Sequence, residues 1–255
     1  MRFFIIVFFV LFSFFSCKLE SKHTIDVSNI NANLSIDRYE VDFYTASKDS
    51  LKNLKNKYPY LFPEEFTDSI ALAKISNKDE QELFLESQKI YKNISNLESQ
   101  LTSLFKHVKY YNPKFRSPKV VTMLSNIDYE NRVIYADSLL FISLDSYLGS
   151  KHKFYADYPK YIKQNNTDKN IIIDVANSII NKQLLSISNR SFISKIIYEG
   201  KKMYLLDMYV NGVSDSIKIG YSEEKMQWAT YNEEDIWKYF IERKLLFSTD
   251  TKLNK

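Results

Sequence analysis

The chain has 255 residues, and 35 Lys and Arg against 31 Asp and Glu give it a net charge of +4. This near balance argues against a dedicated nucleic-acid binder, so we expect no nucleic acid as a partner. A single cysteine rules out an internal disulfide, so stability must come from an apolar core. Only four glycines are present, all between residues 149 and 220, and this composition favours a mostly helical domain.

The N-terminus has the anatomy of an exported protein. Arg2 gives a basic start, the segment 3–15 is apolar apart from one Ser, and Ser16 precedes Cys17. This order is typical of a secretory signal, and a small residue before Cys is similar to the bacterial lipoprotein signal. We therefore predict a signal peptide over 1–16, a lipid on Cys17, and attachment to a membrane through that lipid.

Two other interpretations of this segment remain open. A plain secretory signal would remove Cys17 or leave it as a free thiol, and Phe14 and Phe15 depart from the usual lipoprotein pattern. An uncleaved anchor is disfavoured, because the apolar run of about 13 residues is shorter than the roughly 20 that a spanning helix needs.

The first part of the mature chain is predicted to combine a tether with short elements. Residues 17–36 are polar without a sustained period, which is typical of a tether. Residues 37–44 alternate weakly and predict a strand, and 47–57 predict a helix. Pro59 and Pro63 prevent that helix from continuing, and the aromatic segment between them is expected to pack on the domain.

The clearest amphipathic pattern covers 79–108. Apolar residues recur there at steps of three and four, which predicts one long helix with an apolar stripe. The stripe fits either a helix packed on its own domain, which we favour, or a coiled-coil dimer. His107 lies beside the stripe without a second ligand nearby in sequence, so we interpret it as structural.

Three strands and then several helices are predicted after this point. The β-branched run 119–124 is followed by the strand-like runs 132–137 and 139–144, with turn-forming residues between the first two. Helices are expected over 169–186 with Asp168 as cap, over 192–210, over 222–228, and over 233–246 with Asn232 as cap. The order predicts an α+β domain that is predominantly helical and has a small, mainly antiparallel sheet.

Several segments of this chain resemble the GldB family of gliding-motility lipoproteins. They are YPYLFP (58–63), 128–149, 196–207, 219–240 and LLFSTD (245–250). The resemblance implies a single GldB-like domain over 37–255 and a Bacteroidetes source. It also implies a role in gliding and in the type IX secretion of adhesins. The family continues beyond the LLFSTD segment, so the resemblance further predicts a domain truncated or divergent at its C-terminus.

The same resemblance implies a zincin-like scaffold, distantly related to zinc peptidases with an H-E-x-x-H helix. By order, the helix 169–186 takes the place of that metal helix, yet it contains no His and no Glu. Glu199 and Gly200 match a later Glu-Gly pair, but one carboxylate cannot form a three-ligand zinc site. His23, His107 and His152 lie far apart in sequence, so we expect no metal and no other cofactor.

Glu199 and Gly200 have two interpretations. As relics of a metal site they would hold a groove open or bind a partner. Alternatively, Glu199 pairs with Lys195 or Lys202, and Gly200 permits close approach of another element, since Gly inside a helix costs roughly 0.5–1 kcal/mol.

We therefore expect a non-enzymatic envelope lipoprotein that faces the periplasm. It would bind other gliding or secretion proteins and would have no small-molecule substrate. Candidate partner-binding residues are Tyr221, Trp228, Tyr231 and Trp237, because aromatics are enriched at hot spots. We expect at least one of them to be exposed beside a groove, although core packing is the favoured role for Trp237. Two alternatives remain, an atypical metal-dependent hydrolase on the same scaffold and a passive adhesion or spacer lipoprotein.

Overall fold

A computed structural model describes residues 25–136, 138–250 and 252. The predictions for the signal peptide, Cys17 and His23 therefore fall outside the described residues. The described part of the predicted tether lies against a helix. Lys106 and Lys109 of that helix donate hydrogen bonds to the backbone carbonyls of Ser28 and Asn31, and Ala32 is buried.

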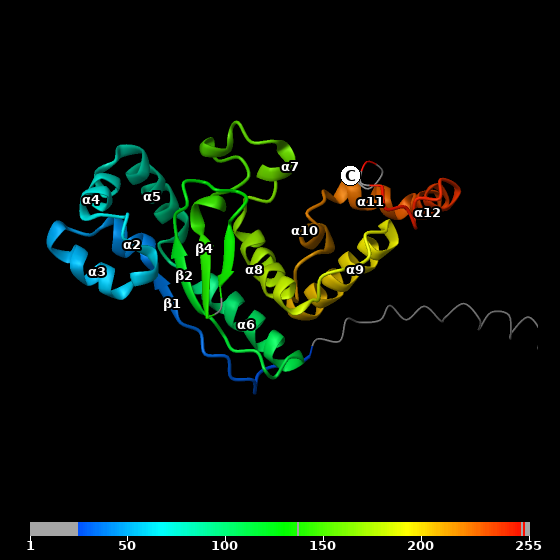
Figure 1. Cartoon of the computed structure of the whole chain (residues 1–255), viewed down its shortest axis with the longest axis horizontal. Helices are drawn as coiled ribbons and strands as arrows, with labels where there is room; N and C mark the ends of the chain where they lie inside the picture. The colour runs from blue at the N-terminus through cyan, green and yellow to red at the C-terminus, as the bar shows by residue number, and fades with distance from the viewer. Residues whose placement is uncertain (1–24, 137, 251, 253–255) are drawn as a thin grey trace, which may run out of the picture.

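Four short strands form one sheet at the centre of the molecule (Figure 1). They are β1 (Ile36–Arg38), β2 (Lys119–Met123), β3 (Val133–Ala136) and β4 (Leu139–Ser143), in the order β1-β2-β4-β3. β1 and β4 both run parallel to β2, and only β3 is antiparallel to its neighbour β4. The α+β class is thus confirmed, whereas the prediction of a mainly antiparallel sheet is wrong.

The parallel pairing follows from how the β3–β4 hairpin docks. β4 lies between β2 and β3, so the second strand of the hairpin pairs with β2, and the first strand forms the edge. β1 reaches its place beside β2 through a long helical connection, which parallel strands require. Val120, Val121 and Thr122 of β2 are all buried, as expected for a strand covered on both faces.

Eleven α-helices lie in the part of the chain that the structure describes. They are α2 (Tyr39–Tyr44), α3 (Leu51–Lys57), α4 (Asp68–Ser76), α5 (Lys78–Tyr91), α6 (Ser95–Tyr111), α7 (Lys160–Lys163), α8 (Asp168–Gln183), α9 (Phe192–Tyr209), α10 (Asp215–Ile219), α11 (Glu223–Tyr231) and α12 (Glu233–Glu242). In Figure 1, α2 to α5 lie on one side of the sheet, and α9 to α12 extend away on the other.

Two predicted elements differ from the structure. The prediction of a strand over 37–44 is wrong beyond Arg38, where the helix α2 begins. In this helix Tyr39 and Phe43 lie one turn apart, and their ring centroids are 5.3 Å from each other. The single helix expected over 79–108 is divided into α5 and α6. At the break, the Asn93 side chain accepts the Ser95 backbone N–H, a local bond that competes with the helix.

The apolar stripe of α6 is part of the core. Leu97, Leu101, Leu104 and Val108 are buried within the domain, as the packed-helix interpretation expects. The buried side of α8 carries Ile171, Val175, Ile179 and their neighbours. One predicted cap differs, since Thr167 and not Asp168 is the N-cap of α8. Asn232 is the N-cap residue of α12 as predicted, but its side-chain amide donates to the Trp228 carbonyl and makes no capping hydrogen bond to α12.

Candidate functional site

The C-terminal helices α11 and α12, together with Tyr221 just before α11, display a group of exposed aromatic side chains, here called the C-terminal aromatic surface. Its members are exposed by 49% for Tyr221, 62% for Trp228, 91% for Tyr231 and 40% for Trp237. Neither α11 nor α12 buries a single residue. A soluble protein normally buries one face of each helix, so two helices without a fully buried residue that carry large exposed aromatics form an unusual surface.

A groove of about 830 Å³ borders this surface. Tyr231, Trp237 and Ile241 supply its apolar part, and the carboxylates of Glu233, Glu234 and Glu242 surround them. The lining of the groove therefore combines apolar with mainly acidic side chains, and Lys238 adds one positive charge.

The chain after α12 holds this surface in place. The backbone N–H groups of Phe192 and Ile193 donate to the carbonyls of Ser248 and Leu246. These bonds satisfy donors that the first turn of α9 would otherwise leave free. The rings of Phe192 and Phe240 also meet edge to face at 5.0 Å. α12 is thus fixed to α9 by its flanking segment, while its aromatic side stays open.

A polar cleft lies between α8 and the edge strand β3. Its volume is about 730 Å³, and Arg132, Asn165, Asp174, Asn177 and Asn181 are among its lining residues. α8, on one side of the cleft, is the helix that the resemblance to the GldB family places at the position of the zinc-binding helix. The cleft offers amides, one guanidinium and the two carboxylates of Asp174 and Glu130, but no histidine.

Asp174 is the central charged group of the cleft. The Tyr147 hydroxyl donates to its Oδ2 atom at 2.7 Å, and Arg132 Nη1 lies 3.9 Å from the same oxygen. Burial raises the pKa of Asp174 above its ordinary value, against the opposing effects of Tyr147 and Arg132. Burial, together with this carboxylate, also raises the pKa of Tyr147 well above its usual range, so the hydroxyl keeps its proton.

The two histidines that the structure describes have local partners. His107 Nδ1 lies 2.8 Å from the Ser103 carbonyl, and its Nε2 lies 2.8 Å from the Asn211 amide. His152 accepts the Phe154 backbone N–H and lies 3.4 Å from Glu86. Within the described residues, no three His, Cys, Asp or Glu side chains form a group that could hold a metal ion.

Glu199 and Gly200 lie on the outer side of α9. The Glu199 side chain is 62% exposed and pairs with Lys202 at 3.2 Å. A Cβ atom placed at Gly200 would meet nothing within 4 Å, so the expectation of a closely approaching element is wrong. Gly200 instead lines an open, mostly apolar pocket of about 450 Å³ with Ile197 and Tyr204.

A family model for the gliding motility protein GldB matches residues 20–255 of the chain. The chain belongs to the GldB family. The resemblance found in its segments is thus confirmed over almost the whole sequence. No curated protein and no solved structure is significantly similar to it.

Membership of the GldB family makes the chain a gliding motility lipoprotein, anchored at the cell envelope. Cys17, the predicted lipid attachment point, lies outside the described residues. Among the helices that the structure does describe, none combines the length and the apolar character needed to cross a membrane.

The Arg132–Asp174–Tyr147 network of this GldB family member was not predicted from the sequence. Its members come from the start of β3, from α8 and from the segment after β4, so no local motif contains them. One signal was present, because Asp174 interrupts the apolar run Ile171–Ile173 and Val175 on the buried side of a helix. A charged residue at such a position needs partners.

Proposed function

We propose that this GldB family member acts by binding other envelope proteins of the gliding machinery through its C-terminal aromatic surface. The lipid on Cys17 would hold it on a bacterial membrane with the domain facing the periplasm. The partners would belong to gliding or to the type IX secretion of adhesins. In this proposal the protein carries out no catalysis and takes no small-molecule substrate.

One observation carries the proposal. α11 and α12 bury no residue, yet they expose Trp228, Tyr231 and Trp237 beside a groove. Exposing such aromatics to water is unfavourable by roughly 25 cal/mol per Å² of apolar surface. Burial against a partner would recover this free energy, and Trp and Tyr are the residues most enriched at binding hot spots.

The scaffold part of the proposal rests on the cleft beside α8. We interpret this cleft as the degenerate counterpart of a metallopeptidase site, because α8 carries neither His nor Glu. Asp174 instead forms a structural pair with Tyr147 and lies near Arg132. An Asp–Tyr pair flanked by Arg is a stable arrangement without a metal.

A complementation experiment tests the partner surface. In a gliding bacterium that lacks its own copy of the gene, we expect the double variant Trp228→Ala/Tyr231→Ala to lose colony spreading. Hot-spot aromatics cost about 2 kcal/mol or more each when truncated, which would largely remove binding. Protein level and membrane fraction should not change, because both side chains are exposed.

The matched control is Tyr110→Ala, since Tyr110 is also exposed but lies on α6. Photo-crosslinkers at positions 231 and 110 give a second measurement, and only position 231 should yield a crosslinked envelope protein. Normal spreading of the double variant, with identical crosslinks from both positions, would contradict the proposal.

A further inference from the structure

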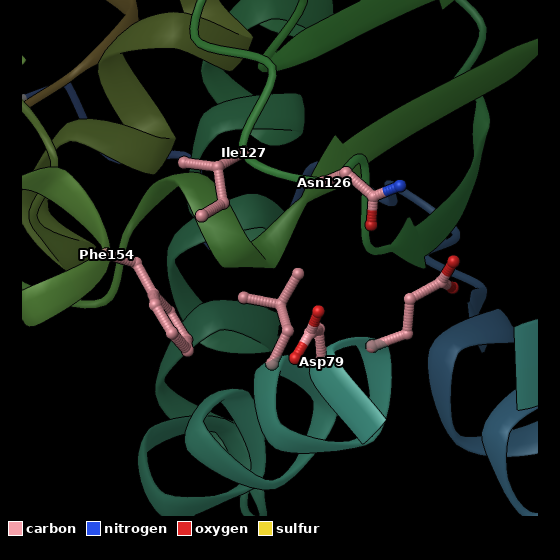
Figure 2. Close-up of a pocket in the computed structure, with 6 residues that line it drawn as sticks. Asp79, Asn126, Ile127 and Phe154 are labelled. Atoms are coloured by element: carbon pink, nitrogen blue, oxygen red, sulfur yellow. The ribbon is translucent and has the colours of Figure 1, made fainter. Parts of the chain in front are cut away.

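A smaller pocket lies beside α5, far from the C-terminal aromatic surface (Figure 1). It has a volume of about 330 Å³ and lies between the first turn of α5 and the loop after β2. Figure 2 shows Asn126 and Ile127 on that loop, facing α5, with Phe154 at the side. The lining residues are Asp79, Glu80, Leu83, Asn126, Ile127 and Phe154.

The loop at this pocket has an uncommon backbone. Asn126 and Ile127 are consecutive residues with φ of 58° and 62°. Asn tolerates this left-handed region, but a β-branched Ile there is a genuine outlier and costs about 1–2 kcal/mol. Strain of this kind persists only where the surroundings enforce it, and it is concentrated at binding and active sites.

A buried carboxylate holds the left-handed backbone conformation of this loop in place. Asp145, which is fully buried, accepts the backbone N–H groups of Ser125 at 3.0 Å and Ile127 at 2.7 Å. On the other side, the Tyr158 hydroxyl donates to the Ile127 carbonyl at 2.6 Å. The Ile127 side chain is thus held as one wall of the pocket.

The pocket combines apolar walls with negative charge. Leu83, Ile127 and Phe154 are apolar, while Asp79 and Glu80 carry carboxylates. Glu80 accepts the Tyr44 hydroxyl and pairs with Lys74. The exposed Asp79 carboxylate has no ion pair or side-chain hydrogen bond among the described residues.

The neighbouring cation Lys153 is already paired, with Glu82 and Glu86. Because Lys153 pairs with these two glutamates, it does not neutralise the Asp79 carboxylate. The volume is suited to one long side chain and is too small for a helix.

We propose that this pocket binds a single basic side chain, arginine or lysine, from an extended segment of a partner protein. The aliphatic stem would lie against Leu83, Ile127 and Phe154, and the cationic head would reach Asp79. Such stems cover apolar surface while the charged group remains paired or hydrated. The inference goes beyond the aromatic surface, because it specifies a second recognition site and the chemistry of its ligand.

The test uses the full mature lipidated chain in detergent micelles, labelled at Ile and Leu methyl groups. Three blocked pentapeptides, Gly-Ser-X-Ser-Gly, are titrated with X as arginine, citrulline or norleucine. We expect the arginine peptide to shift the Ile127 and Leu83 methyl signals saturably, with a Kd on the order of 1 mM. Citrulline keeps the shape of the arginine side chain but not its charge, so the citrulline peptide should bind at least about tenfold more weakly than the arginine peptide.

Two variants localise the binding. Asp79→Asn should weaken the arginine peptide about tenfold, whereas Glu98→Gln, a matched change on α6, should leave it unchanged. Ile127→Gly suits the positive φ and removes the pocket wall. It should therefore stay folded while losing the peptide response at Leu83.

Equal binding of the arginine and citrulline peptides would overturn the proposal. So would tighter binding of norleucine, which would mean an apolar occupant. The absence of any saturable shift at about 10 mM would also refute it. The Trp228→Ala/Tyr231→Ala variant should keep the arginine response, so failure here is distinguishable from failure of the aromatic surface.

Discussion

At the level of single residues, a fully buried aspartate, Asp145, and a half-buried one, Asp174, organise this domain in different ways. Asp145 accepts backbone N–H groups and fixes the loop at Ile127. Asp174 accepts a tyrosine hydroxyl and lies near an arginine at the edge of a cleft. Burial raises the pKa of both carboxyl groups, so each ionised form is held in the folded state at some cost.

The cost of ionising Asp174 predicts how stability depends on pH. Its pKa is raised from the unfolded value of 3.8. Protonated Asp174 therefore contributes to the stability of the folded state. This contribution is fully present below pH 3.8 and is lost as the pH rises through the folded-state pKa of Asp174. Asp174→Asn has no proton to lose and keeps an oxygen that can accept from Tyr147.

The stability of Asp174→Asn relative to the native chain should therefore increase with pH. Urea unfolding of both proteins at a series of pH values measures this difference, in which all other titrating groups cancel. A difference that stays constant between acid and neutral pH would show that Arg132 and Tyr147 offset burial, and one that falls would show that they outweigh it.

At the level of elements, the sequence predicts local structure better than arrangement. β2, β3 and β4 lie within a residue or two of their predicted positions, because β-branched runs between turn formers are a local signal. The order of strands is not local. The pairing of β4, instead of β3, with β2 depends on how a hairpin docks, and this made the antiparallel prediction wrong.

The same limit applies to the site. The aromatic residues 221–237 could be singled out because they are close in sequence, and the structure shows their exposure directly. Arg132, Tyr147 and Asp174 meet only through the tertiary fold. The left-handed conformation of Ile127 could not be predicted either, since Ile disfavours it and the buried Asp145 that enforces it comes from another segment.

The open face of α11 and α12 leads to a prediction about stability. Trp228 and Ile241 are 62% and 61% exposed, so Trp228→Ser and Ile241→Ser should each change the free energy of unfolding by less than about 0.5 kcal/mol. By contrast, Leu101→Ala removes a fully buried side chain of α6 and should cost about 2–5 kcal/mol.

Urea unfolding of the three variants measures these values. If either surface substitution destabilised the chain nearly as much as Leu101→Ala, its side chain would be packing within the domain. It would then be unavailable to a partner.

At the level of the whole molecule, the two proposed recognition sites and the described end of the tether lie on different elements. Figure 1 shows α5, which borders the acidic pocket, on the opposite side of the sheet from α11 and α12, which carry most of the aromatic surface. The chain enters the domain beneath α6, where Lys106 and Lys109 hold residues 28 and 31. A lipid on Cys17 would therefore be joined to the domain through a segment whose described part lies on α6.

The anchor itself can be tested by Cys17→Ser. Each buried methylene of a lipid chain contributes about 0.8 kcal/mol, and two or more chains hold a protein stably on a membrane where one does not. We expect the variant to lose metabolic labelling with an alkyne fatty acid and to move from the membrane fraction to the soluble fraction. Ser21→Ala, a similar change just after the cysteine, should keep both the label and the membrane association. A variant that stays wholly in the membrane fraction without label would show instead that the apolar segment 3–15 remains attached and acts as the anchor, because no lipid could then account for the retention.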